Sequence, residues 1–128
     1  MPHVILEYSS NLAELTDIDE LVVAVHEAAL ATGTAPLDAL RTRAVARHHY
    51  AIADRDPDNM FLAITARLGA GRADDEKHAF VEALLAAVVD QLGDAPTLMI
   101  SVEYQEIDPS FRINRNNLRQ LIAARRAE

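Results

Sequence analysis

Proline at position 2, directly after Met1, is the first residue whose type and place permit chemistry. Proline is small enough for the initiator methionine to be removed, which leaves a free secondary amine at the start of the chain. A terminal α-amine has an ordinary pKa of about 8. Burial and nearby arginines both favour its neutral form, so we expect the Pro2 amine to have a pKa nearer neutrality and to act as a general base.

Arg72 is a second candidate, within the segment Gly69-Ala70-Gly71-Arg72-Ala73-Asp74. A helix is predicted to follow, and the first N–H groups and the dipole of a helix attract an anion. An arginine beside them can hold a carboxylate through two parallel hydrogen bonds. The dinucleotide-binding pattern GxGxxG is not met, because Asp74 stands where the third glycine is needed. The segment therefore indicates either a carboxylate site or a plain surface arginine.

Three further arginines, Arg41, Arg43 and Arg47, lie on one side of a predicted strand over 39–47. Alternate side chains of a strand share a face, and three like charges on one face are costly unless anions meet them. For Arg43 and Arg47 we favour solvent or a subunit interface over a role in a site.

Other residue patterns lack the spacing that a metal site requires. Asp54, Asp56 and Asp58 imitate the start of a calcium loop, but Asn59 and Thr65 replace the glycine and glutamate that such a loop needs. The five histidines lack ligand spacing, so no metal site is expected. Because the chain has no cysteine, disulfides, thiolate metal sites and cysteine nucleophiles are excluded.

Two strand–helix–strand units are predicted to position these residues. In each unit a short apolar strand precedes a helix with an apolar stripe, and an alternating strand follows. The predicted elements are a strand over 2–8, a helix over 17–32 and a strand over 39–47, then a strand over 60–68, a helix over 74–92 and a strand over 98–105. Asp17 or Asp19 can cap the first helix and Gly33 can end it, and its expected stripe consists of Ile18, Leu21, Val22, Val25 and Ala29. Asp74 is the expected N-cap of the second helix and Gly93 ends it, and its expected stripe consists of Lys77, Val81, Leu84, Leu85, Val88 and Leu92.

An internal duplication supports this plan. Gly33-Thr34-Ala35-Pro36 and Gly93-Asp94-Ala95-Pro96 share the pattern G-x-A-P, 60 residues apart, and both lie between a helix and the strand that follows. Strands joined through a helix run parallel with a right-handed crossover. We therefore predict an α+β (α/β) fold in one domain over 1–128: two tandem β-α-β units, approximately 2–47 and 60–106, form one four-stranded mixed sheet with two helices on one face.

The other face of that sheet lacks a cover. Only a short C-terminal helix, approximately 116–126, remains, and it is too small to bury a sheet face. Oligomerisation through the open face is therefore expected.

The length, net charge and hydropathy of the chain exclude several classes of function. With 128 residues, half of them hydrophobic, the chain is long enough for a real core. The net charge of −8 opposes nucleic-acid binding. The longest apolar run, 83–89, is too short to span a bilayer, and the first residues lack a secretory signal. We expect a cytoplasmic protein with no nucleic-acid or membrane partner.

Taken together, these features resemble the tautomerase superfamily, most closely the 5-carboxymethyl-2-hydroxymuconate Δ-isomerases. The resemblance depends on Met1-Pro2, two fused units, an arginine in the second strand and GAGR before the second helix. It runs from PHVILEYSSN through ATGTAPLDALRTR and LGAGR to INRNNL, and the second half is also similar to the short subunits of 4-oxalocrotonate tautomerase.

The resemblance implies a tautomerase-like fold with Pro2 as the catalytic residue and Arg41 and Arg72 as substrate-binding residues. One complete site per chain is implied, because Leu12 and Ser101 stand at the places that match these arginines in the opposite unit. It implies a homotrimer and a cofactor-free isomerase that ketonises 5-carboxymethyl-2-hydroxymuconate in homoprotocatechuate degradation. The substrate class is a small anionic di- or tricarboxylate.

Alternatives stay open. The same proline supports phenylpyruvate-type tautomerases, decarboxylases and hydratases of this superfamily. A non-catalytic trimeric ligand-binding protein is the remaining alternative, because with Met1 retained the Pro2 nitrogen would be an amide without basicity.

Overall fold

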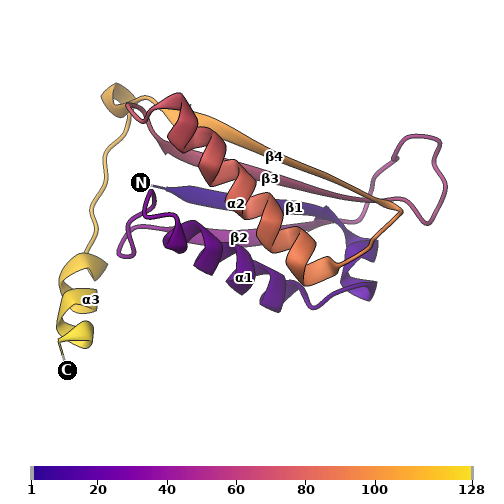
Figure 1. The fold of residues 1–128 in the computed structure, drawn as a ribbon, viewed down its shortest axis with the longest axis horizontal. Coiled ribbons are helices and arrows are strands. Elements are labelled where there is room, and N and C mark those ends of the chain that lie inside the picture. The colour runs from indigo at the N-terminus through magenta and orange to yellow at the C-terminus, as the bar shows by residue number, and fades with distance from the viewer. Residues whose placement is uncertain (1, 128) are drawn as a thin grey trace.

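A four-stranded sheet with two helices across one face forms the body of the molecule (Figure 1). The computed structural model describes residues 2–127. In chain order the elements are β1 (His3–Ser9), the 3₁₀ helix η1 (Ser10–Glu14), α1 (Ile18–Ala31), β2 (Arg41–Arg47), β3 (Met60–Gly69), α2 (Asp74–Leu92), β4 (Leu98–Ile107), the 3₁₀ turn η2 (Pro109–Phe111) and α3 (Leu118–Arg126).

The strands confirm the predicted mixed sheet and its duplication. Their order is β2-β1-β3-β4, with β1 parallel to β2, β3 parallel to β4, and the central pair β1 and β3 antiparallel. His3 pairs with Arg41 in the first unit, and Ala63 pairs with Ser101 in the second. Both members of the second pair lie 60 residues after their counterparts, so the two units share one strand register.

The core lies between the sheet and the two helices. The sheet contributes alternate residues of β1 and β3. Each helix contributes one stripe, which consists of Leu21, Val25 and Ala29 in α1 and of Phe80, Leu84 and Val88 in α2. The stripe expected in α1 is confirmed. In α2 the expected stripe is partly wrong, because Phe80 is fully buried whereas Leu85 is 40% exposed. Residues four apart along one side of α2 face the sheet, and Leu85 is turned away from it.

The helix ends follow the sequence signals in three places out of four. Asp17 caps α1 by accepting a hydrogen bond from the Glu20 N–H, and Gly33 and Gly93 take positive φ values of 77° and 64° where the helices end. The expected N-cap at Asp74 is wrong: Ala73 occupies the cap without a side-chain bond, and Asp74 is the first helical residue. There its charge still interacts favourably with the helix dipole.

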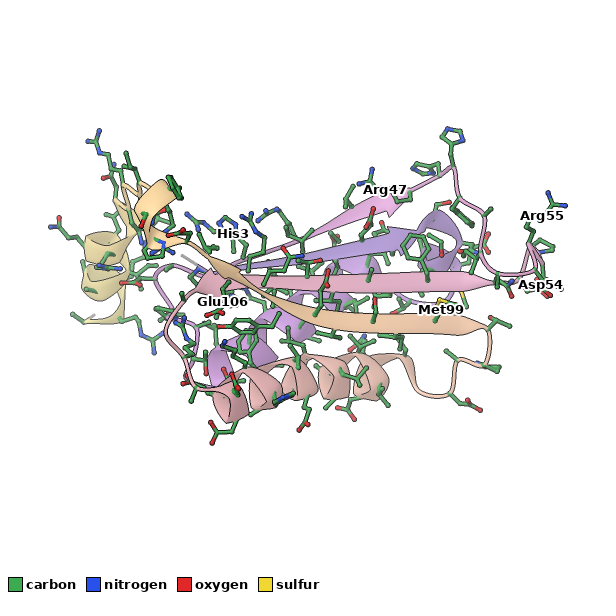
Figure 2. All side chains as sticks on the ribbon, turned by 90° about the horizontal axis from the view of Figure 1, so that it is seen from above. His3, Arg47, Asp54, Arg55, Met99 and Glu106 are labelled. Carbon is green, nitrogen blue, oxygen red and sulfur yellow. The ribbon has the colours of Figure 1, made fainter. Side chains whose placement is uncertain are left out.

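The opposite face of the sheet is open, as expected. In Figure 2 the side chains of His3, Arg47 and Met99 lie on the side of the sheet away from α2. Met99 is 57% exposed and Val45, on β2, is 38% exposed. The chain after β4 leaves the sheet, and α3 lies beyond its end rather than over the open face (Figure 1).

Candidate active site

A pocket of about 550 Å³ lies where β1 begins and β3 ends. This volume is within the range of small-molecule sites. Pro2 is buried and forms part of its wall. The other lining residues come from the loop before β2, the loop before α2 and the C-terminal segment: Pro36, Ala39, Gly69, Ala70, Arg72, Arg112, Asn114, Asn116 and Arg119.

Backbone pairing fixes the position of Pro2. The Arg41 N–H donates a hydrogen bond to the Pro2 carbonyl at 3.3 Å, which continues the pairing of β1 with β2 to the start of the described chain. Pro2 is therefore held at the end of a central strand, beside the pocket. This is a rigid place for a reacting group.

Arg72 connects the two units at this pocket. Its Nη1 donates to the Gly69 carbonyl at 2.9 Å and its Nη2 donates to the Thr34 carbonyl at 3.1 Å. Its Nε lies 3.9 Å from Glu76 Oε2, and the Thr34 hydroxyl donates to the same oxygen at 3.0 Å. These bonds fix the orientation of the guanidinium group, and Arg72 lines the same pocket as Pro2.

Arg41 lies elsewhere. Its side chain is exposed on the open sheet face, where Nη1 is 3.3 Å from His3 Nε2. It borders a separate cavity of about 370 Å³ between the 37–41 segment and α3. Within one chain the structure therefore brings Pro2 and Arg72 together but leaves Arg41 outside their pocket.

His3 is the centre of a cationic cluster on the open face. Arg43 Nη1 lies 3.1 Å from His3 Nδ1, on the other side of the ring from Arg41. Partial burial lowers the pKa of His3 below its usual 6.5, and the charges of Arg41, Arg43 and Arg67 lower it further. At neutral pH the imidazole is therefore neutral.

The two remaining strand arginines differ in their partners. Arg47 Nε donates to Glu7 Oε2 at 2.6 Å, across the β1–β2 pair, and both side chains are largely exposed. Arg47 thus belongs to a surface ion pair, which matches the interpretation favoured from the sequence. Arg43 meets the His3 ring and lies on the face where a subunit interface is expected.

The C-terminal segment contributes residues that sequence reasoning missed. Arg112, Asn114, Asn116 and Arg119 all line the Pro2 pocket. Asp38 holds this segment: its carbonyl accepts from Asn116 Nδ2 and its carboxylate from Arg119 Nε, each at 2.7 Å. The available signal was the basic, asparagine-rich tail RINRNNLR. α3 therefore helps to close the pocket.

The pocket is locally cationic although the chain is acidic. Its lining contains Arg72, Arg112 and Arg119 and no carboxylate side chain among the described residues. Against a net charge of −8, this arrangement attracts a small anion to one place.

A third cavity, also of about 370 Å³, lies between α2 and β4. Lys77 Nζ is 3.1 Å from Glu106 Oε1 there and 5.9 Å from the centre of the Tyr104 ring. The Glu106 carboxylate raises the pKa of Lys77, and burial raises the pKa of the Tyr104 hydroxyl. Both groups therefore keep their protons at neutral pH.

Two further features of residues 2–127 concern metal binding and membrane insertion. Within them no group of three or more histidine, aspartate or glutamate side chains is arranged to hold a metal ion. Nor does any helix in that range have the length and apolar character needed to cross a membrane.

The chain is similar to known proteins over nearly its whole length. The family model for 5-carboxymethyl-2-hydroxymuconate isomerase matches residues 2–122. The chain belongs to this family. The 5-carboxymethyl-2-hydroxymuconate Delta-isomerase of Escherichia coli is 30% identical over 124 residues, which are 94% of this chain and 98% of that protein.

Solved structures agree with the family. A 5-carboxymethyl-2-hydroxymuconate isomerase from Deinococcus radiodurans R1 is 31% identical, with a TM-score of 0.86 over 94% of this chain and 93% of its own. A fused 4-OT described as a symmetric trimer shares the fold at 21% identity, with a TM-score of 0.64 over 90% of this chain and 92% of its own. The chain is thus an isomerase of the tautomerase superfamily, and the resemblance, the fold and the enzyme class expected from the sequence are confirmed.

Proposed function

We propose that the chain converts the dienol 5-carboxymethyl-2-hydroxymuconate to its keto isomer, without a cofactor, with the Pro2 nitrogen as general acid and base. One observation carries the proposal: Pro2 is buried in a pocket whose charged side chains are all arginines. A free amine in these surroundings favours its neutral, basic form. The family and the relatives named above support this substrate.

The reaction moves one proton. Neutral Pro2 nitrogen takes the hydroxyl proton of the dienol, the double bonds shift, and the same nitrogen returns a proton to the distal carbon. Arg72, fixed by its bonds to the Gly69 and Thr34 carbonyls, binds a substrate carboxylate and stabilises the charge that develops between the two steps.

The nitrogen must be free for this chemistry, so Met1 must be removed. Met1 lies outside the residues that the structure describes, and its removal stays a prediction.

The working form in this proposal is a homotrimer. The two edge strands of the open face carry unlike charges: Arg41 and Arg43 on β2, and Glu103 on β4 at the place that matches Arg43. Unlike edges favour head-to-tail contact, which can close into a ring. Arg41, which lies outside its own chain's pocket, would then bind substrate in the pocket of the next copy. The trimeric relative with the same fold supports this assembly.

A cytoplasmic place in homoprotocatechuate degradation is part of the same proposal. A panel that includes phenylpyruvate, an oxaloacetate-type decarboxylation substrate and a haloacrylate separates the proposed activity from the other activities of the superfamily.

The test measures ketonisation against pH in protein whose intact mass shows that Met1 is absent. The rate on free enzyme should rise with pH through one ionisation below about 8, because burial and the arginines disfavour the protonated amine. One residue added before Pro2 should lower the rate by about 10²- to 10⁴-fold, the usual contribution of a general base. Pro2→Ala, which keeps a primary amine, should lose part of this activity.

Circular dichroism and light scattering on the same samples provide the control for folding and assembly. A fully active preparation that retains Met1, or a pH profile unchanged by blocking the amine, would contradict the role of Pro2. A monomer with full activity would contradict the trimeric site.

A further inference from the structure

The three arginines of the Pro2 pocket differ in what already compensates their charge. Arg72 binds two backbone carbonyls and lies near Glu76. Arg119 forms an ion pair with Asp38 at 2.7 Å. Arg112 has no ion-pair partner within residues 2–127, and its Nη1 atom is buried without a hydrogen-bond partner there.

The position of Arg112 brings this unpaired group against the pocket wall. Arg112 directly follows η2 and is half-buried. Its Nη1 lies over Gly69, where an added Cβ would be 3.4 Å away. The carbonyl of the same glycine accepts the hydrogen bond from Arg72 Nη1. Two guanidinium groups therefore meet at Gly69, one already bonded and one with an N–H group to spare.

An unpaired guanidinium N–H favours an anionic ligand. A buried donor without an acceptor is costly, and the cost is removed when Arg112, which also lines the pocket, turns this N–H group toward an oxygen bound there. The planar fork of arginine fits a carboxylate in particular. Asn114, two residues along the same extended segment, lines the same pocket and offers a neutral donor beside it.

We propose that Arg112 binds the carboxymethyl carboxylate of the substrate and so makes the pocket selective for a tricarboxylate over a dicarboxylate. This inference rests on the proposed function. The muconate skeleton has two carboxylates, for which Arg72 and Arg41 are the candidates, and the carboxymethyl group adds a third. Arg112 lies after both duplicated units, so the third contact comes from a part of the chain that the duplication did not supply.

The experiment compares two substrates in two variants. For Arg112→Gln and Arg112→Lys, kcat/KM is measured on 5-carboxymethyl-2-hydroxymuconate and on 2-hydroxymuconate, which lacks the carboxymethyl arm. Arg112→Gln should lower kcat/KM on the tricarboxylate by about 10- to 100-fold and on the dicarboxylate by no more than about 3-fold, because a charge-assisted hydrogen bond is lost with one substrate alone. Arg112→Lys should restore part of the loss, and the pH profile should not move.

Arg115→Gln is the matched control, because Arg115 lies in the same segment but borders the cavity beside α3 instead of the Pro2 pocket. Its substrate ratio should equal that of the unchanged protein. Equal losses on both substrates in Arg112→Gln, or no loss on either, would overturn the inference.

A ligand-binding measurement tests the role of Arg112 independently of the proposed catalytic activity. In calorimetry, the unchanged protein should bind propane-1,2,3-tricarboxylate more tightly than pentanedioate, and Arg112→Gln should lose that preference. If the protein ketonises neither substrate, the proposed function fails, whereas the calorimetric preference still decides the role of Arg112. A preference that survives in Arg112→Gln counts against it.

Discussion

The two strand–helix–strand units follow one backbone plan but connect their first strand to their helix in opposite ways. In the first unit the connection contains η1, which buries Leu12 completely in the core. In the second unit Arg72 stands at the matching place, half-buried and bonded to Thr34 of the first unit. The same position thus closes one end of the molecule with an apolar side chain and opens the other as a cationic pocket.

At the first and last strands the difference runs the other way, because here the first unit carries the candidate residues, Pro2 and Arg41. Leu62, which matches Pro2, lies inside β3 and is 1% exposed, so its nitrogen is an amide of the sheet. Ser101 on β4 matches Arg41 on β2. The duplicated frame therefore repeats the core but carries each proposed site residue once, in keeping with the rule that function depends on side chains placed on a fold and not on the fold itself.

Stability measurements should show the largest difference between the matching positions. Leu12→Ala should lower the free energy of unfolding by about 2–5 kcal/mol, because it leaves a cavity in the core. Arg72→Ala should lower it by about 1 kcal/mol, since the lost bonds lie at a half-buried loop. Urea denaturation provides both values, and Leu15→Ala, at a 44% exposed position of the same connection, is the control. Similar losses of unfolding free energy in Leu12→Ala and Arg72→Ala would contradict the expected difference between the two positions.

Kinetics should show the reverse contrast. Arg72→Ala and Arg41→Ala should each lower kcat/KM on the proposed substrate by about 10-fold or more, because each removes a charged hydrogen bond to a carboxylate. The fold should not change, which circular dichroism checks, and kcat/KM is compared at protein concentrations where light scattering shows the same oligomer in each variant. If both variants keep nearly full activity, these residues are surface arginines.

The smallest effect concerns His3, whose counterpart in the second unit, Ala63, cannot titrate. The pKa of His3 is lowered in the folded chain, so the unfolded chain takes up the proton first as the pH falls. Stability should therefore decrease as the pH falls through about 6.5 and level off below the folded pKa. His3→Gln should remove this component, measured as the difference in urea midpoints at pH 7.5 and 5.5. An NMR titration midpoint of His3 above 6.5 would contradict the expected sign.

Sequence patterns predicted those features that repeat. Strand alternation and the shared G-x-A-P pattern predicted the sheet, the duplication and the open face, because these depend on local periodicity and on a constant spacing. The core face of α2 was harder, since apolar residues occur all round this helix and both Leu85 and Val89 are exposed while Phe80 is buried.

Residues that line the pocket were predictable only where they lie within the two repeated units. Pro2 and Arg72, which both line the pocket, were candidates because of their places beside a strand and a helix. Arg112 and Arg119 were not found, because they reach the pocket through contacts with Gly69 and Asp38, far away in the sequence, that follow no period. For Arg41, alternation gave the face of the strand but not its distance from Pro2.

The antiparallel pairing of β1 with β3 at the centre of the sheet has a consequence for synthesis on the ribosome. β1 is bonded by β2 on one edge, and its other edge is closed only by β3, which is translated later. Until residues 60–69 emerge, the first unit has a bare strand edge and an apolar face that lacks α2. An unpaired edge of this kind adds strands from other chains. Fragments that end within the 48–59 connection should therefore aggregate, although they contain a complete strand–helix–strand unit.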